Sequence, residues 1–147
     1  NVTEQTIEKP ETLSGKELLE TEHFLQQQTT FKTTILRFGG LIGGSRNPAK
    51  SLSEKTNIAT PNAPINLVHQ DDCIGIITAI IEQNYWNQKL NASAPFHPTR
   101  KEYYTAKAKQ LELPLPEFEE NDASGKVIDS SRLIAELGYN FVHVEDI

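Results

Sequence analysis

Residues 33–48, which read TTILRFGGLIGGSRNP, are the most informative stretch for the fold of this chain. An apolar, β-branched run ends at Phe38, and four glycines follow within the six positions 39–44. β-branched and aromatic side chains favour strands, whereas glycine permits tight bends and close approach of the backbone to other groups. The sequence therefore predicts a buried strand over Phe31–Phe38 that ends in a glycine-rich bend.

The glycine segment contains neither of the standard phosphate-binding motifs. A P-loop needs lysine directly after its second glycine; Gly39 and Gly44 have the required offset, but Ser45 occupies the lysine position. The dinucleotide fingerprint needs glycines at positions i, i+2 and i+5, and the segment supplies no such triple. Two interpretations stay open: a tight bend after a buried strand, or a loop against which a planar ligand lies while Arg46 binds its phosphate.

Helices and strands alternate along the rest of the chain. We predict helices over residues 16–27, 48–55, 71–84, 99–113 and 131–139, and strands over 31–38, 65–69, 89–93 and 126–130. The first strand is expected to pack between the helices 16–27 and 71–84, and residues 39–47 and 56–64 read as irregular. Such alternation is typical of an α/β fold with mainly parallel strands, here in a single domain, residues 1–147.

Two polar residues at the start of the apolar helix are candidates for its cap. Asp71 or Asp72 is expected to bind the free N–H groups of its first turn. His69 precedes them at the end of a strand, and is either a substrate or acid/base contact or a structural neighbour; the sequence favours the structural explanation. Cys73 lies among apolar residues and is expected to be an inert core thiol.

Composition and charge exclude several classes of function. A formal charge of −6 and a pI near 5.2 argue against a nucleic acid partner, because phosphate binding needs a basic face. No apolar run is long enough to span a membrane, and the single cysteine favours a reducing cytoplasm. The four histidines lack the spacing of metal ligands, so no metal site is expected. Of Tyr103 and Tyr104, one ring is expected to be packed and the other exposed.

Four stretches in a fixed order resemble the C-terminal half of the NAD-dependent epimerase/dehydratase family. These are extended short-chain dehydrogenase/reductases, and the resemblance is strongest to their atypical nucleoside-diphosphate-sugar-epimerase-like branch. The stretches are TTILRFGGLIGGSRNP, INLVHQDD, LNASAPFHPTRKEYY with KQLELPLPEF, and GKVIDSSRLIAELGY, and together they cover about residues 10–139. The resemblance implies the C-terminal part of a Rossmann-like, NAD(P)-binding parallel sheet with the small substrate-binding α/β region.

The resemblance also implies where the ligands would lie. In that family the segment after the sixth strand runs beside the nicotinamide and into the substrate region. The implied cofactor-binding residues are Phe38, Gly39 and Gly40, and the implied substrate-binding residues are Leu41, Arg46 and His69. Because Gly40 replaces an asparagine that contacts substrate in many relatives, no particular sugar nucleotide follows.

Two departures from the family pattern concern its chemistry. The glycine fingerprint of the first strand–helix unit has no counterpart here, and the first four to five strands are expected to be missing. Aligned through Gly15 and Glu22, the positions of the family's Tyr-x-x-x-Lys pair hold Ser14 and Leu18. Ser14 does not titrate near neutral pH, and Leu18 has no charge to lower the pKa of a proton donor. Ser14 is expected to cap the first helix instead.

Three functional hypotheses remain. The first is the C-terminal, substrate-side part of an NAD(P)-dependent nucleotide-sugar epimerase/dehydratase-like protein, inactive by itself, with NAD or NADP and a sugar-nucleotide-like ligand bound in the complete protein. The second is a non-catalytic NAD(P)- or ligand-binding regulatory or interaction module of the same fold. The third is an interaction subunit whose incomplete sheet is completed by a partner chain. The expected macromolecular partners are a missing N-terminal segment or a partner chain, and a second copy of this chain. In all three, no cofactor is expected to bind tightly to this chain alone.

Overall fold

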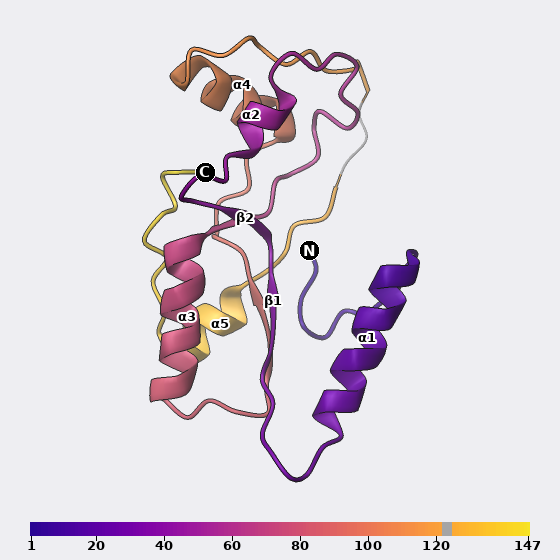
Figure 1. Cartoon of the computed structure of the whole chain (residues 1–147), viewed down its shortest axis with the longest axis vertical. Helices are drawn as coiled ribbons and strands as arrows, with labels where there is room; N and C mark the ends of the chain where they lie inside the picture. Colours follow the sequence, from indigo (N-terminus) through magenta and orange to yellow (C-terminus); the bar gives the residue numbers. More distant parts are fainter. Residues whose placement is uncertain (122–124) are drawn as a thin grey trace.

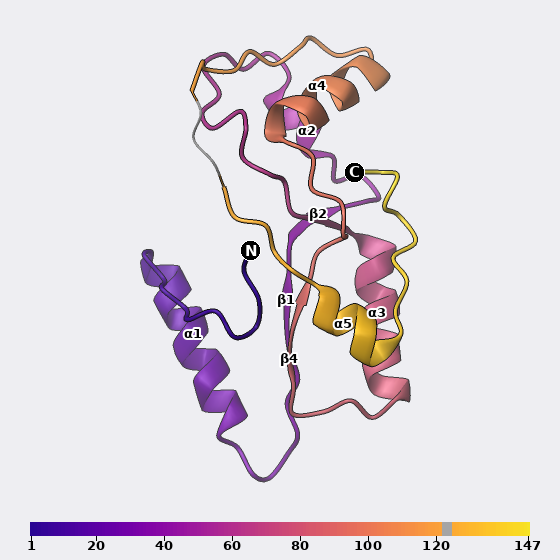
Figure 2. The same cartoon turned by 180° about the vertical axis from the view of Figure 1, so that it is seen from behind.

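The computed structural model describes residues 1–121 and 125–147, which form an α/β structure (Figures 1 and 2). Its helices are α1 (Leu13–Gln26), α2 (Pro48–Leu52), α3 (Gln70–Glu82), α4 (Arg100–Gln110) and α5 (Ser131–Leu137). Its strands are β1 (Ile35–Phe38), β2 (Gly40–Ile42), β3 (Leu67–His69) and β4 (Lys89–Ala92). Among the described residues, no helix combines the length and the apolar character that crossing a membrane requires.

The two strand pairs of the described residues are parallel, as the alternation of helices and strands predicts. β1 pairs with β4 and places Leu36 beside Leu90, and β2 pairs with β3 and places Leu41 beside Val68. Only Gly39 separates β1 from β2, so the chain passes directly from one pair to the other (Figure 1). The expected α/β class with parallel strands is therefore confirmed.

Two apolar clusters form the core. The first joins α3, α5 and β4, and its buried members are Ile76, Ile80, Leu90, Ala92, Leu133 and Leu137. Figure 2 shows α3 and α5 together on one face of the pair formed by β1 and β4. The second cluster joins β2, β3, α4 and the C-terminal residue, and its buried members are Ile42, Ile65, Leu67, Ala94, Tyr103 and Ile147. The second cluster packs the end of β2 at Ile42 and the start of β3 at Leu67 against Tyr103 of α4.

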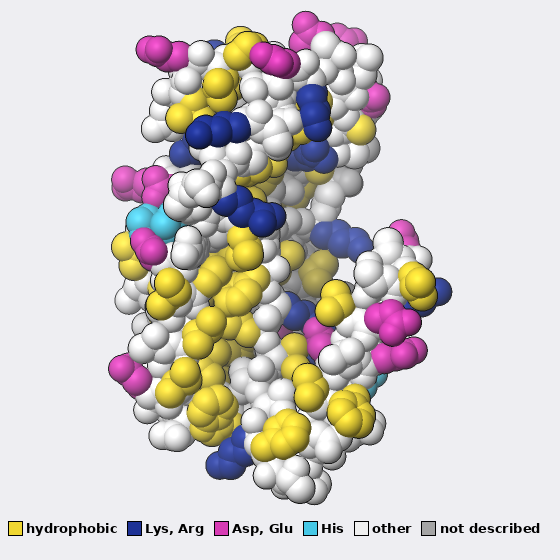
Figure 3. Space-filling model, in the orientation of Figure 1, with side chains coloured by type: hydrophobic (Ala, Val, Ile, Leu, Met, Phe, Trp, Pro, Cys, Tyr) yellow, Lys and Arg dark blue, Asp and Glu magenta, His cyan; other side chains and the backbone are white. Residues whose placement is uncertain are grey.

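Helix α1 is tied to β1 by charged side chains. None of its residues is buried. The guanidinium of Arg37 on β1 pairs with Glu22 of α1 and with Glu8, and Glu8 also pairs with Lys89 on β4 at 2.6 Å. The hydrogen bond from Lys89 is the largest of the effects that lower the pKa of Glu8 to about 2. Figure 3 shows a hollow between α1 and the rest of the molecule.

The expected packing of the first strand between two helices is confirmed on one side. Leu36 packs against the cluster that contains α3, but the strand begins only at Ile35 and Phe31 is 52% exposed. Towards α1, two polar contacts are present: the pair of Arg37 with Glu22, and a 3.4 Å hydrogen bond from the Thr33 hydroxyl, just before the strand, to a carbonyl of α1.

Three helix ends follow the usual capping preferences of their residues. Asn47 caps α2, and its side chain accepts the N–H of Ala49. Pro48 fits the first turn because an N–H group at that position would have no partner within the helix. Thr99 and Glu102 form the capping box of α4. Gly138 ends α5 with a φ of +62°, a backbone conformation that glycine adopts without steric cost.

Three other local predictions are wrong. The cap of α1 is Thr12, whose hydroxyl accepts the N–H of Gly15 at 3.1 Å, and Ser14 lies inside the first turn. Residues 126–130 contain an isolated parallel bridge between Ile128 and Val2 rather than a strand, and on the other side the N–H of Ile128 bonds to the side chain of Asn66. Residues 40–42 of the glycine segment are not irregular but form strand β2.

Candidate functional site

A polar pocket opens where β2 and β3 end. Because these strands are parallel, their carboxyl ends at Ile42 and His69 lie side by side, which is where α/β proteins bind ligands. We call this cavity of about 200 Å³ the strand-end pocket. Its lining residues are Ile42, Gly43, Gly44, Arg46, Asn47, Pro48, His69, Tyr103, Lys107 and Asp146.

A glycine turn shapes one wall of the strand-end pocket. Gly43 and Gly44 have φ values of +112° and +57°, which other residues rarely adopt. A Cβ at Gly43 would lie 2.6 Å from Nε2 of His69, so only glycine leaves room for that ring. The N–H of Arg46 donates to the carbonyl of Gly43 at 3.0 Å, and this tight turn holds Arg46 at the pocket.

The structure brings together two of the three expected substrate-binding residues. Arg46 and His69 both line the strand-end pocket. Leu41, the third, lies on β2 with 41% of its surface exposed and does not line the pocket. Lys107, from α4, does line it and was not expected from the sequence, since its charge alone does not distinguish it from the neighbouring lysines of that helix.

The residues expected to border the cofactor lie between β1 and β2. Phe38 packs against the cluster of α3 and α5. A Cβ at Gly39 would lie 2.7 Å from the carbonyl oxygen of Asn66, and a Cβ at Gly40 would lie 2.8 Å from the side chain of Leu67. Both glycines therefore have a structural explanation, the close approach of two parts of this chain, while their contact with a cofactor stays a prediction.

Replacing Gly39 by alanine distinguishes the two explanations. The added Cβ would overlap the carbonyl of Asn66, and overpacking of this kind costs about 1–3 kcal/mol. We therefore expect the free energy of unfolding, measured in urea without any ligand, to fall by about that amount. The control Ser45→Ala, at an exposed residue of the same segment, should change it by less than about 0.5 kcal/mol. Unchanged stability of Gly39→Ala would indicate that this glycine is needed only for a ligand.

Two imidazole rings stack beside the strand-end pocket. The ring centroids of His69 and His143 are 3.8 Å apart, and the ring planes differ by 29°. His69 is also the cap of α3, since its Nδ1 accepts the N–H of Asp71 at 3.2 Å. The expectation that Asp71 or Asp72 provides this cap is wrong, because Asp72 turns into the interior and Asp71 remains exposed.

Asp72 anchors the C-terminal segment to α3. Its carboxylate is fully buried and accepts hydrogen bonds from the hydroxyl of Tyr139 at 2.9 Å and from the backbone N–H groups of Val142 and His143 at 2.8 and 3.2 Å. Burial, followed by the hydrogen bond to Asp72, raises the pKa of the Tyr139 phenol. These bonds hold residues 139–143 in place and so position His143 against His69.

Carboxylates surround His143. Its Nδ1 lies 2.6 Å from Oδ2 of Asp146, and its Nε2 lies 3.1 Å from Oδ2 of Asp71. The hydrogen bond to Asp146 is the largest effect that raises the pKa of His143, and the imidazole in turn lowers the pKa of Asp146.

The nearby Cys73 is buried, and burial raises the pKa of its thiol, as expected of an inert core cysteine.

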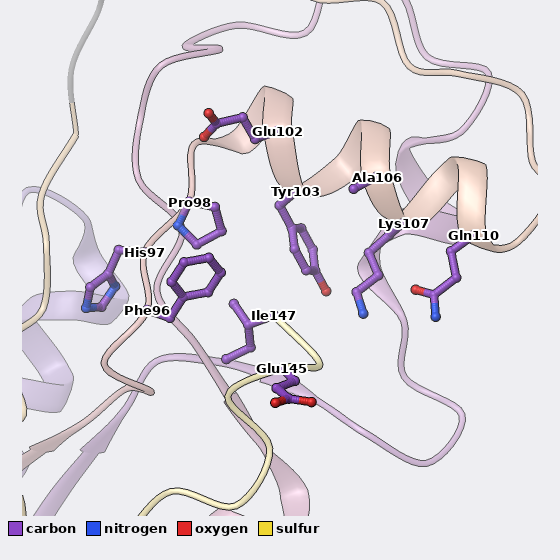
Figure 4. A pocket seen from close by; sticks show the side chains of 10 residues that line it. All are labelled: Phe96, His97, Pro98, Glu102, Tyr103, Ala106, Lys107, Gln110, Glu145 and Ile147. Atoms are coloured by element: carbon purple, nitrogen blue, oxygen red, sulfur yellow. The ribbon is translucent and has the colours of Figure 1, made fainter.

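A larger and more apolar pocket adjoins the strand-end pocket and lies between α4, residues 96–98 and the C-terminal residues 145–147 (Figure 4). Its volume is about 650 Å³, and Tyr103 and Lys107 line both pockets. Burial is the main effect that raises the pKa of Tyr103 to about 12, so this phenol stays protonated near neutral pH. Tyr104 also packs against the core, and the expectation of one exposed tyrosine ring is therefore wrong.

The positions that correspond to the family's Tyr–Lys pair are on α1 and line neither pocket. Ser14 is exposed, and its hydroxyl lies 3.3 Å from that of Thr12. Leu18 is 66% exposed. The described structure therefore offers no tyrosine with a lowered pKa next to the strand-end pocket.

Parallel strands flanked by helices, with a pocket at their carboxyl ends, define a Rossmann-like fold. A putative NAD-dependent epimerase/dehydratase from Methylobacillus flagellatus has the same fold over 97% of this chain and 52% of its own, with a TM-score of 0.78 and 22% identity. WbmG from Bordetella bronchiseptica, solved in complex with NAD and UDP, matches 96% of this chain and 49% of its own, with a TM-score of 0.78 and 16% identity. The expected epimerase/dehydratase fold is confirmed.

Sequence comparison identifies a more similar protein. Protein YeeZ of Escherichia coli strain K12 is 36% identical over an alignment of 144 residues, and the match covers 95% of this chain and 52% of YeeZ. The chain thus spans about half the length of the curated relatives that it matches. No protein-family model matches it.

Proposed function

We propose that this chain is the substrate-side, C-terminal part of an NAD(P)-dependent nucleotide-sugar epimerase/dehydratase-like protein, and that the strand-end pocket binds the anionic group of the ligand. The observation that carries the proposal is the convergence of Arg46, His69 and Lys107 at the carboxyl ends of two parallel strands. Guanidinium and ammonium groups bind phosphate oxygens through charge-assisted hydrogen bonds, and an imidazole adds a further donor.

The two adjoining pockets fit the two chemical parts of such a ligand. The strand-end pocket is polar and holds two cationic side chains, Arg46 and Lys107, beside the carboxylate of Asp146. The larger pocket exposes the apolar side chains of Phe96, Pro98 and Ile147 (Figure 4). A nucleoside diphosphate likewise combines a charged diphosphate with a planar, uncharged base. The structure of WbmG with NAD and UDP is consistent with this ligand class.

The pocket can be tested by titrating UDP into the chain labelled with ¹⁵N. We expect changes in chemical shift at residues 43–47, His69 and Lys107, and their loss in Arg46→Ala. The control is Arg100→Ala, since Arg100 lies on α4 and lines neither pocket. Shift changes that are absent, or that are equally strong in Arg46→Ala and the unmodified chain, would contradict the proposal.

NAD and NADP are proposed to bind in the complete protein and only weakly to this chain. Arg46 would add one charge-assisted contact of about 1.5–3 kcal/mol, whereas a micromolar site requires about 8 kcal/mol. In this fold the remaining affinity comes from a glycine-lined helix start that binds the pyrophosphate, and the chain contains no such motif. Calorimetric titration of NAD and NADP should therefore show no micromolar binding; a micromolar dissociation constant would mean that the glycine segment does bind the cofactor.

A second candidate is a non-catalytic ligand-binding or regulatory module of the same fold. The residues Ser14 and Leu18, in place of a titratable pair, favour it. The enzyme and the non-catalytic module can be distinguished with a longer protein in which this chain is joined to a glycine-rich strand–helix unit. Turnover of a sugar nucleotide by that protein would support the enzyme, and binding without turnover would support the module.

A further inference from the structure

Four side chains from two distant parts of the sequence meet at the start of α3. His69 and Asp71 belong to the end of β3 and the first turn of α3, and His143 and Asp146 belong to the C-terminal segment. Oδ2 of Asp71 lies 3.1 Å from Nε2 of His143 and 3.6 Å from Nδ1 of His69. One carboxylate oxygen thus approaches a nitrogen of each imidazole ring.

We propose that His69, Asp71 and His143 bind a divalent transition-metal ion such as Zn²⁺. One donor atom from each residue lies within 4.8 Å of the other two. Ligands at about 2.0–2.1 Å around a tetrahedral Zn²⁺ are about 3.3 Å apart, close to the 3.1 and 3.6 Å that separate Oδ2 of Asp71 from the two ring nitrogens. Binding requires the stacked rings to turn so that both point at the ion, and Nδ1 of His69 to release the N–H of Asp71 that it accepts here. The ligand set of two imidazoles and one carboxylate is one that catalytic zinc sites use, and it leaves a fourth position for water or for a ligand in the strand-end pocket.

The surroundings of His143 favour metal binding through its Nε2. A histidine that binds a metal usually donates its other ring N–H to a carboxylate, and Asp146 stands 2.6 Å from Nδ1 of His143. The backbone N–H of His143 is fixed by the buried Asp72, and the missing side chain of Gly43 leaves space for the ring of His69. Both histidine side chains are partly shielded, with 16% of His69 and 27% of His143 exposed.

The site escaped the sequence analysis because its histidines are far apart in the chain. Metal motifs read from sequence rely on short spacings, whereas His69 and His143 meet only after the C-terminal segment has packed on α3. The proposal does not depend on nucleotide binding, since none of its three ligands requires a substrate.

The test is calorimetric titration of the chain with Zn²⁺, together with Co²⁺ as a spectroscopic probe. We expect one ion per chain and visible absorption bands typical of tetrahedral Co²⁺. His143→Ala should weaken Zn²⁺ binding by at least about a hundredfold, and Asp146→Asn by about 10–100-fold, because loss of an orienting carboxylate has effects of that size. The control His23→Ala removes a histidine of α1 outside the cluster and should bind Zn²⁺ like the unmodified chain.

A further variant separates metal binding from folding. Since His143→Ala can loosen the C-terminal segment, Asp71→Ala removes a ligand whose side chain is 64% exposed and leaves the buried contacts intact. It should unfold like the unmodified chain and still lose most of its affinity for Zn²⁺. Absence of binding by the unmodified chain, or equal affinity in Asp71→Ala, would overturn the proposal and leave the cluster as a set of ion pairs.

Discussion

Replacing Asp72 by alanine is expected to lower the free energy of unfolding by about 3–5 kcal/mol. The Asp72 carboxylate is fully buried and accepts three hydrogen bonds from residues 139–143. Each hydrogen bond to a charged group contributes about 1.5–3 kcal/mol, and part of that loss is recovered when water reaches the freed donors. Losses of this size are typical when a buried charge network is broken. Denaturant unfolding, followed by the fluorescence of Trp86, measures the change.

The adjacent Asp71 provides a matched control for this experiment. It lies in the same helical turn, but its side chain is 64% exposed, and exposed ion pairs contribute about 0–1 kcal/mol. Asp71→Ala should therefore change stability by less than about 1 kcal/mol. Asp72→Asn keeps the shape of the side chain but turns an amide NH₂ towards N–H donors, so its effect should be intermediate. Equal effects of Asp71→Ala and Asp72→Ala would show that the C-terminal segment is not anchored through Asp72.

The parts of the fold that follow local rules were predictable from the sequence. The period of apolar residues identified α3 over residues close to its true bounds, and the helices predicted over 48–55 and 131–139 begin where α2 and α5 begin. The parallel pairing followed from the alternation of strands and helices. Each of these signals lies within one element or in the order of elements, and tertiary contacts are not needed to read it.

The parts that depend on long-range contacts were not predictable. Strand β2 is specified by its pairing with β3, since glycine at its first position disfavours a strand when read alone. The residue type and position of Asp72 are typical of a helix cap. Only the contacts with Tyr139 and the residues after it explain why the side chain is buried instead. The same holds for the strand-end pocket, where Lys107 joins Arg46 and His69 from a separate helix.

The exposed face of α3 has the properties of an association surface. We define this α3 face by Ile74, Ile77 and Ile81, which are 56%, 44% and 55% exposed and follow one another at helical spacing. Figure 3 shows hydrophobic side chains extending from this part of the molecule towards the hollow beside α1. Among the described residues, β1 has β4 as its only strand neighbour, so one of its edges is unpaired. Exposed apolar stripes and unpaired strand edges both favour contact with another chain.

We therefore expect the isolated chain to associate with itself. The double variant Ile77→Lys/Ile81→Lys should suppress that association. Burial of one isoleucine side chain contributes about 1.5–3 kcal/mol, so the double variant should weaken self-association at least tenfold. The control Leu115→Lys places the same charge at a residue that is 50% exposed in the segment after α4. Sedimentation velocity over a range of concentrations should show dimers or larger species for the unmodified chain and for the control, and monomers for the double variant. A monodisperse monomer that unfolds in one cooperative transition at high concentration would show instead that the chain is stable as an independent domain with this face in water.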